Sequence, residues 1–160
     1  MTYRDRLDER LVLIVDDDED VLSSIELALR TEGAETLTAS DGNAAVSLCQ
    51  HQLPEAVVLD MMLPKRSGFL VLEKIMELDE PPVVVMITAN QGKRHMAYAK
   101  SLGVHAYMNK PVPLERLIET VAELLEQRDA LLDDADDGME DADEPADDED
   151  AVVIEGADED

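Results

Sequence analysis

The chain has 160 residues, with 39 acidic side chains against 13 basic ones and a formal net charge of −26 at pH 7. This length allows one domain with a real hydrophobic core and some additional chain. The charge argues against binding to nucleic acid or to an anionic membrane surface, since both need clusters of Lys and Arg, and no apolar stretch approaches the ~20 residues of a membrane-spanning helix.

Short apolar runs alternate with helical patterns from residue 11 onwards, which predicts an α/β domain. In chain order we expect a strand over residues 11–15, a helix over 19–32, a weak strand over 35–38, a helix over 43–51, a strand over 56–59, a helix over 68–78, a strand over 83–87, a helix over 92–102, a strand over 105–108, and a helix that starts after Pro113 and frays between Arg128 and Leu132. The first, third and fourth strands are continuous apolar runs. Such runs are typical of parallel strands covered by helices on both faces.

The sequence divides into an N-terminal extension over residues 1–10, a folded domain over residues 11–128 and an acidic tail over residues 129–160. The tail contains 17 acidic residues and no Lys or Arg. It cannot bury enough apolar area to offset its chain entropy, so we expect it to be disordered. Residues 133–160 show no helical or strand pattern, so we expect no output domain after the folded domain, which predicts a stand-alone domain. The apolar run at residues 151–154 is either an incidental patch or a docking motif that adds a strand to a partner's sheet.

Five polar side chains stand just after the predicted strands: Asp16, Asp17, Asp60, Thr88 and Lys110. The carboxyl ends of parallel strands meet at one edge of a sheet, and ligands bind there at the point where the strand order reverses. In a doubly wound sheet of order 2-1-3-4-5, the first and third strands are neighbours at that reversal. The three aspartates would therefore face one another.

Three carboxylates this close repel one another and raise each other's pKa values unless a cation neutralises them. Mg²⁺ is the natural candidate, with Mn²⁺ as an alternative, because it binds a few carboxylates, waters and a phosphate oxygen. A hydroxyl and an ammonium at the same edge complete a site suited to handling a phosphoryl group.

The joint pattern resembles the receiver domain of response regulators in two-component signalling, over about residues 10–128. The matching motifs are Val15-Asp-Asp-Asp18, Asp60-Met-Met-Leu-Pro64, Gly68, Thr88-Ala89 and Lys110-Pro111. A lone Asp-Asp pair is weak evidence for the family. A Pro four residues after Asp60 and a Gly eight residues after it make the combined pattern specific. The resemblance, which includes the chemotaxis regulators, implies a flavodoxin-like fold with a doubly wound, five-stranded parallel sheet in strand order 2-1-3-4-5 and five helices.

The resemblance also implies a role for each site residue. Asp60 would be the phosphoacceptor, whose carboxylate attacks phosphorus and carries an aspartyl phosphate. Lys110 would pair with Asp60 at rest and with phosphoryl oxygens afterwards, aimed inward by a cis Lys110–Pro111 peptide. The implied Mg²⁺ ligands are Asp16, Asp17, Asp60 and the backbone carbonyl of Met62.

Signalling would follow from a two-state equilibrium that phosphorylation shifts. Thr88 would move its hydroxyl to the phosphoryl group, and Tyr107 would swing inward to fill the vacated space. The change would appear on the surface of the fourth helix, the fifth strand and the fifth helix, where His95, Tyr98 and Arg116 are expected to be exposed.

Three further residues, Met62, Ala89 and Asn90, are expected to line the phosphoryl pocket. Ala89 is small enough to leave room for the phosphoryl group. Met62 offers no group that could orient an attacking water, so we expect slow self-dephosphorylation.

The implied function is a binding and switching module rather than an enzyme. A sensor histidine kinase or phosphotransfer protein would supply the phosphoryl group, and the domain would signal to an unidentified downstream protein by contact, as a monomer or a weak phosphorylation-dependent dimer. A phosphorelay intermediate or phosphate sink is the open alternative.

Competing site classes fit less well. A Mg²⁺-dependent aspartyl-phosphate phosphatase is disfavoured because Met62 stands where such enzymes carry a second Asp. A nucleotide-binding protein is disfavoured because no Gly-rich loop with Lys-Ser/Thr follows the first strand. Carboxylates in that loop also argue against a flavodoxin-type cofactor, whose phosphate they would repel.

The single cysteine, Cys49, and an N-terminus that lacks the apolar region of a signal peptide predict a cytoplasmic location. Even residues 1–128 carry more acids than bases. This excess is either an adaptation to a salty cytoplasm, as in a halophile, where salt screens self-repulsion, or the property of an ordinary acidic domain.

Overall fold

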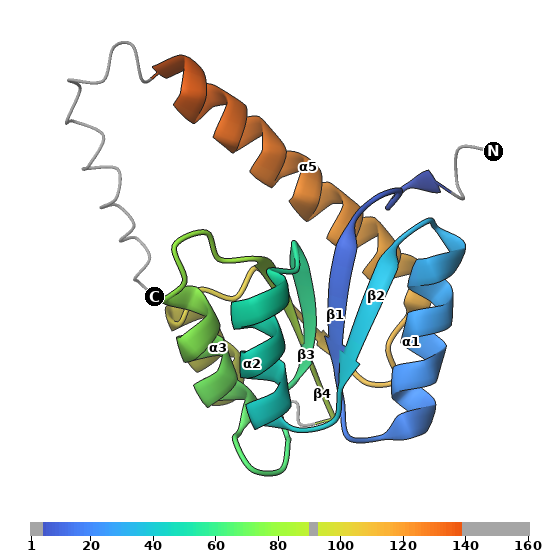
Figure 1. Ribbon diagram of the computed structural model, residues 1–160. Helices are drawn as coiled ribbons and strands as arrows, with labels where there is room; N and C mark the ends of the chain where they lie inside the picture. The colour runs from blue at the N-terminus through green and yellow to red at the C-terminus, as the bar shows by residue number, and fades with distance from the viewer. Residues whose placement is uncertain (1–4, 90–92, 139–160) are drawn as a thin grey trace. The chain divides into compact units, whose positions relative to one another are not determined.

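The computed structural model describes residues 5–89 and 93–138 (Figure 1), so Asn90 and the run at residues 151–154 lie outside the described residues. The chain divides into two compact units, Met1–Glu126 and Gln127–Asp160. The elements are β1 (Leu11–Val15), α1 (Glu19–Thr31), β2 (Glu35–Ala39), α2 (Gly42–Gln52), β3 (Ala56–Asp60), α3 (Gly68–Met76), β4 (Val83–Thr88), α4 (Lys93–Ser101), β5 (Ala106–Asn109) and α5 (Leu114–Gly138).

The five strands form one parallel sheet in the order β2-β1-β3-β4-β5, which confirms the predicted doubly wound topology. Val15, the last residue of β1, lies beside Ala39 and Leu59. At the same edge Asp60 of β3 lies beside Ile87, which precedes Thr88 at the end of β4. The register therefore brings the carboxyl ends of the central strands together.

Alternate residues of the central strands point into two separate hydrophobic clusters. Val12 and Ile14 of β1 belong to the cluster that also contains residues of α1 and of the first turns of α5. Leu13 and Val15 belong to the cluster formed with α2, α3 and α4. Figure 1 shows α1 on one side of the sheet and α2 and α3 on the other. Burial on both faces explains why these strands read as continuous apolar runs.

The first three helices each begin at a side chain that caps their free amides. Asp18 accepts hydrogen bonds from two amides of the first turn of α1, at 3.0 and 3.3 Å. Asp41 accepts one from Ala44 at 2.8 Å, and Ser67 accepts one from Leu70 at 3.3 Å. These caps fix the points at which the chain turns back from the sheet edge into a helix.

Residues 5–10 pack against the sheet unit, which the sequence pattern did not predict. Leu7 is fully buried in the cluster of α1 and α5, and its amide donates to the Glu32 carbonyl at 2.9 Å. The Arg6 guanidinium pairs with Glu32 at 3.0 Å and with Glu115 at 2.9 Å. The segment thereby joins the end of α1 to the start of α5.

The prediction that the last helix frays between Arg128 and Leu132 was wrong, because α5 continues to Gly138. Its acidic residues alternate there with Ala and Leu, which are strong helix formers, and each Asp costs only about 0.7 kcal/mol relative to Ala. Within the second unit, Leu131 and Leu132 are exposed. Residues 139–160, the rest of the predicted disordered tail, lie outside the described part of the chain. No described helix is both long and apolar enough to cross a membrane.

Candidate functional site

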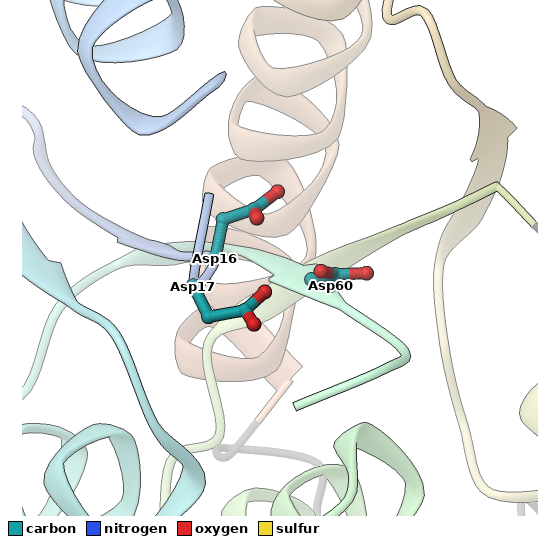
Figure 2. Close-up of side chains that lie close together, drawn as sticks. All are labelled: Asp16, Asp17 and Asp60. Carbon is teal, nitrogen blue, oxygen red and sulfur yellow. The ribbon is translucent and has the colours of Figure 1, made fainter. Parts of the chain in front are cut away.

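Three carboxylates meet where β1 and β3 end, as the sequence predicted. One oxygen each from Asp16, Asp17 and Asp60 lies within 4.8 Å of the others. Figure 2 shows the three side chains next to one another, two from the chain after β1 and one from β3. Asp16 and Asp60 are 0% and 3% exposed, whereas Asp17 is exposed, so a ligand can reach the trio from the Asp17 side.

Lys110 brings the only positive charge recorded in contact with these carboxylates among the described residues. Its ammonium lies 2.9 Å from Oδ2 of Asp16 and donates a hydrogen bond to Oδ2 of Asp60 at 3.3 Å. Its backbone amide donates to the Thr88 carbonyl at 2.8 Å, and the Lys110–Pro111 peptide is cis, as predicted. Residues distant in sequence thus share one pocket.

Backbone amides hold the remaining carboxylate oxygens. The Asp18 amide donates to Oδ1 of Asp16 at 2.9 Å, and the Met62 amide donates to Oδ1 of Asp60 at 3.2 Å. Each donor lies two residues after its acceptor, so the turn that follows each strand also orients the carboxylate at the strand end. For Asp60, one oxygen is held by Met62 and the other faces Lys110.

The charges in this pocket are unbalanced. Burial, followed by the charge of Asp16, raises the pKa of Asp60 from 3.8 to about 6, against the lowering effects of the Met62 amide and Lys110. Burial would by itself lower the pKa of Lys110, but its contacts with Asp16 and the charge of Asp60 raise the pKa above its ordinary value. One ammonium therefore does not neutralise three carboxylates.

The donor set fits a hard divalent cation. It consists of carboxylate oxygens, which Mg²⁺ and Mn²⁺ prefer. Oxygens on opposite sides of a Mg²⁺ ion lie about 4 Å apart, so the observed spread of up to 4.8 Å needs only a small inward rotation of the side chains. A dication would also remove the excess negative charge.

The other predicted pocket residues lie at the same edge. Thr88 is fully buried at the end of β4, and Ala89 after it is exposed. Met62 is 61% exposed, and its backbone amide donates to Oδ1 of Asp60. Asn90, the third predicted pocket residue, lies outside the described residues.

Tyr107 lies half-buried on β5 and packs against the cluster of α2, α3 and α4. Its hydroxyl donates to Sδ of Met61 at 3.9 Å, and Met61 is the residue directly after Asp60. This contact was missed at the sequence level, because nothing in the pattern links two residues 46 positions apart.

The predicted surface around α4 is partly as expected. Tyr98 is 48% exposed and Arg116 is exposed. His95 is half-buried rather than exposed, because its ring stacks on Phe69 at 5.9 Å. Tyr98 meets the same Phe69 edge-on at 4.9 Å, so the ring of Phe69 on α3 supports both α4 side chains.

A hollow of about 290 Å³ adjoins the site. Its walls are largely apolar and come from the first turns of α1, from the chain between β5 and α5, and from the first residue of α5. The lining residues are Asp20, Val21, Ser24, Ile25, Lys110, Pro111, Val112 and Leu114. Lys110 therefore stands between this hollow and the carboxylate trio.

Comparison with known proteins identifies related chains. The family model for the response regulator receiver domain matches residues 12–122. The probable transcriptional regulatory protein TcrX of Mycobacterium tuberculosis is 34% identical over 116 residues, which are 72% of this chain and 50% of TcrX. The chain spans about half the length of the curated relatives it matches.

Two solved structures are similar to about three quarters of this chain. A CheY-like receiver domain from Methanospirillum hungatei JF-1 has 27% identity and a TM-score of 0.73, covering 76% of this chain and 98% of that one. A chain of the CheX-CheY-BeF3-Mg²⁺ complex from Borrelia burgdorferi has 26% identity and a TM-score of 0.69, covering 76% of this chain and 97% of that one.

Proposed function

Because this chain belongs to the response regulator receiver domain family, we propose that it accepts a phosphoryl group on Asp60 from a sensor histidine kinase or a phosphotransfer protein. The convergence of Asp60 with the Lys110 ammonium at 3.3 Å, and with two further carboxylates within 4.8 Å, carries this proposal. A nucleophilic carboxylate, a fixed cation and a cation site in one pocket are the parts that phosphoryl transfer requires.

In the transfer, an oxygen of Asp60 attacks the phosphorus of a phosphohistidine. The bond between phosphorus and the imidazole nitrogen breaks, and its electron pair stays on that nitrogen. Lys110 faces the oxygens on which charge accumulates, and the Met62 amide keeps the carboxylate in place. With its pKa at about 6, Asp60 is mostly ionised at pH 7 and can act as the nucleophile.

Asp16, Asp17, Asp60 and the Met62 carbonyl would hold Mg²⁺ or Mn²⁺. The bound ion would offset the carboxylate charge and polarise the phosphoryl oxygens. The similar protein from Borrelia burgdorferi, whose complex contains BeF3 and Mg²⁺, supports this choice of ion. The Thr88 hydroxyl, at the neighbouring strand end, would donate to the phosphoryl group, for which the small Ala89 leaves room.

The apolar hollow beside Lys110 suits the donor protein, because a side chain inserted there would place the donor histidine next to the site. Phosphorylation would then shift a two-state equilibrium in which Thr88 and Tyr107 move. The output would be a changed surface on α4, β5 and α5, read by a protein partner, or onward transfer of the phosphoryl group in a relay. We propose protein contact as the main output, in a cytoplasmic monomer or weak dimer.

This function is a switch rather than turnover of an external substrate. A phosphatase with an aspartyl nucleophile would need an acid or base two residues after Asp60, and Met62 cannot supply one. The acidic chain also offers no basis for binding nucleic acid by itself. The region matched by this chain is about half of TcrX. The transcriptional role in the name of TcrX therefore belongs to that longer protein.

Incubation of the full chain with acetyl phosphate tests the proposal. Intact-mass measurement should find one added phosphoryl group in the presence of Mg²⁺ and none in EDTA. Asp60→Asn should abolish the addition, whereas Asp79→Asn, an exposed carboxylate away from the site, should leave it unchanged. Equal labelling of wild type and Asp60→Asn would contradict the assignment of Asp60.

A further inference from the structure

The loop that follows Asp60 is fastened to the first turn of α2. The Gly42 amide donates to the Pro64 carbonyl at 3.3 Å, and Nε of Arg66 donates to Oδ1 of Asn43 at 3.1 Å. We call these four residues, Gly42, Asn43, Pro64 and Arg66, the loop anchor. None of them belongs to the carboxylate site itself.

Gly42 allows an unusually close approach of the two backbones. A Cβ atom at this position would lie 2.2 Å from the Arg66 carbonyl oxygen and 2.5 Å from the Arg66 Cβ. Because the nearest atom belongs to the backbone, no side-chain rotation relieves the overlap. Any residue larger than Gly at position 42 must displace the loop.

The other end of the loop is held equally closely. The Gly68 amide donates to the Met61 carbonyl at 2.9 Å, and a Cβ at position 68 would lie 2.5 Å from the Asp60 carbonyl oxygen. Between the two anchored ends lies Met62, whose amide holds Asp60. Only Leu63 separates Met62 from Pro64, so a displacement at the outer end must reach the Met62 peptide.

The loop does not keep this shape by local preference alone. Lys65 has φ of +68°, in the left-handed region that non-glycine residues adopt at a cost. Contacts with α2 must therefore hold the turn in place. The Arg66–Asn43 hydrogen bond is exposed, as is the ammonium of Lys65 that lies 3.9 Å from Asp41. Exposed contacts of this kind add little to the free energy of unfolding. Their main effect is therefore on where the loop lies relative to α2.

We infer that the loop anchor is a positioning element for the phosphoacceptor site. By fixing Pro64 and Arg66 on α2, it sets the Met62 peptide against Asp60 and thereby the geometry of the cation and phosphoryl pocket. The biological role of the loop anchor rests on the proposed function. Its effect on the Met62 peptide can be measured without phosphorylation, in the metal-free and the Mg²⁺-bound protein.

The Asn43 pair of variants separates positioning from folding. Asn43→Ala removes the acceptor for Arg66, whereas Asn43→Asp keeps an acceptor oxygen and should restore the contact. Mg²⁺ titration of the full-length, isotope-labelled chain is followed by the Asp60 and Met62 amide resonances. The affinity of Asn43→Ala should be about three- to tenfold weaker. This loss is smaller than the roughly 10–100-fold loss seen when a group in direct contact with a metal ligand is removed, because Asn43 acts on Asp60 only through the loop. Asn43→Asp should match wild type, and all three proteins should unfold at similar temperatures.

Gly42→Ala should have the larger effect, a loss of about tenfold or more in Mg²⁺ affinity and a shifted Met62 amide resonance before any ion is added. Gly103→Ala is the matched control, because Gly103 also has a restricted backbone, with φ of +103°, but faces the flexible Met76 side chain. It should lower the unfolding temperature and leave Mg²⁺ affinity unchanged. If Gly42→Ala does not fold, the comparison of Asn43→Ala with Asn43→Asp still tests the positioning role.

The positioning role is overturned if Asn43→Ala binds Mg²⁺ as wild type does and leaves the Met62 resonance in place. It is also overturned if Asn43→Asp is as impaired as Asn43→Ala. Failure of the wild type to accept a phosphoryl group from acetyl phosphate would instead refute the proposed function, and the Mg²⁺ and Met62 measurements would still test the anchor.

Discussion

At the scale of single residues, the end of β3 makes several different contacts in the pocket. Asp60 has one oxygen on a backbone amide and the other on an ammonium, and its buried carbonyl backs onto Gly68. Its neighbour Met61 contacts Tyr107 on β5. The proposed phosphoacceptor and the residue that contacts β5 are therefore consecutive in the chain.

Asp60→Asn should stabilise the metal-free protein at neutral pH. Between the ordinary pKa of 3.8 and the folded value of about 6 the native state holds a proton that the unfolded state has lost, so wild-type stability falls as pH rises through this window. Asn carries no ionisation, so the variant should be more stable by about 1–3 kcal/mol at pH 7 in EDTA. Urea unfolding at pH 7 and at pH 4 measures this difference, which should disappear near pH 4. If the stability difference between Asp60→Asn and wild type grew on acidification, the predicted direction of the pH dependence would be wrong.

Met62 should make the phosphorylated form long-lived. Its exposed side chain has no hydrogen-bonding group with which to orient a water for attack on the aspartyl phosphate. Met62→Gln, which supplies such a group, should shorten the half-life by about three- to tenfold, followed as loss of the added phosphoryl mass. Met62→Leu is the matched control. A wild-type half-life of seconds would refute the expectation.

At the scale of elements, sequence reasoning succeeded where local pattern decides the structure. Continuous apolar runs identified β1, β3 and β4. Of the polar residues that follow the predicted strands, the structure brings the three aspartates of the site and Lys110 together at one edge of the sheet. Sequence reasoning failed for Leu7, a single apolar residue among charged neighbours, because no periodicity marks a residue that only the α1 and α5 cluster buries. The Arg66–Asn43 contact, 23 positions apart and outside any motif, was invisible for the same reason.

The end of α5 failed for a different reason. The density of acidic residues after Arg128 was interpreted as disorder, although the intervening Ala and Leu residues favour a helix. Composition over a long window therefore outweighed local propensity in the prediction. A residue-by-residue reading of residues 127–138 would have extended the helix.

The N-terminal segment makes its own testable contribution. Leu7→Ala removes a fully buried side chain and should lower the free energy of unfolding by about 2–4 kcal/mol. Leu27→Ala, at a position that is 69% exposed, should change it by less than about 0.5 kcal/mol. Urea denaturation of the two variants measures both effects. Equal effects would mean that the segment does not pack as described.

At the scale of the whole molecule, charge dominates. The net charge of −26 places many acids on a small surface, and the few bases are used in specific places. Arg6 joins two acidic helix ends, and Arg10 pairs with Glu55 at 2.7 Å. The remaining repulsion between acids destabilises the folded chain unless salt screens it.

Raising KCl from about 0.1 M to about 2 M should therefore stabilise the protein, since the Debye length falls from about 10 Å to below 3 Å. A gain of about 1–2 kcal/mol corresponds to a rise of roughly 2–8 °C in unfolding temperature for a chain of this size, measurable by circular dichroism. Replacing acids 147–150 with Asn and Gln should reduce the rise. An unfolding temperature that is flat or falls with KCl would contradict adaptation to high salt.

The contact between Tyr107 and Met61 gives this protein an optical signal of its own. The chain has no Trp, three Tyr and one Phe, whose emission is weak, so its near-ultraviolet fluorescence comes mainly from the tyrosine phenols. One of those phenols touches the thioether next to Asp60. Any event at that carboxylate that displaces the sulfur alters the environment of the ring, and fluorescence of the unlabelled chain becomes a real-time record of occupancy.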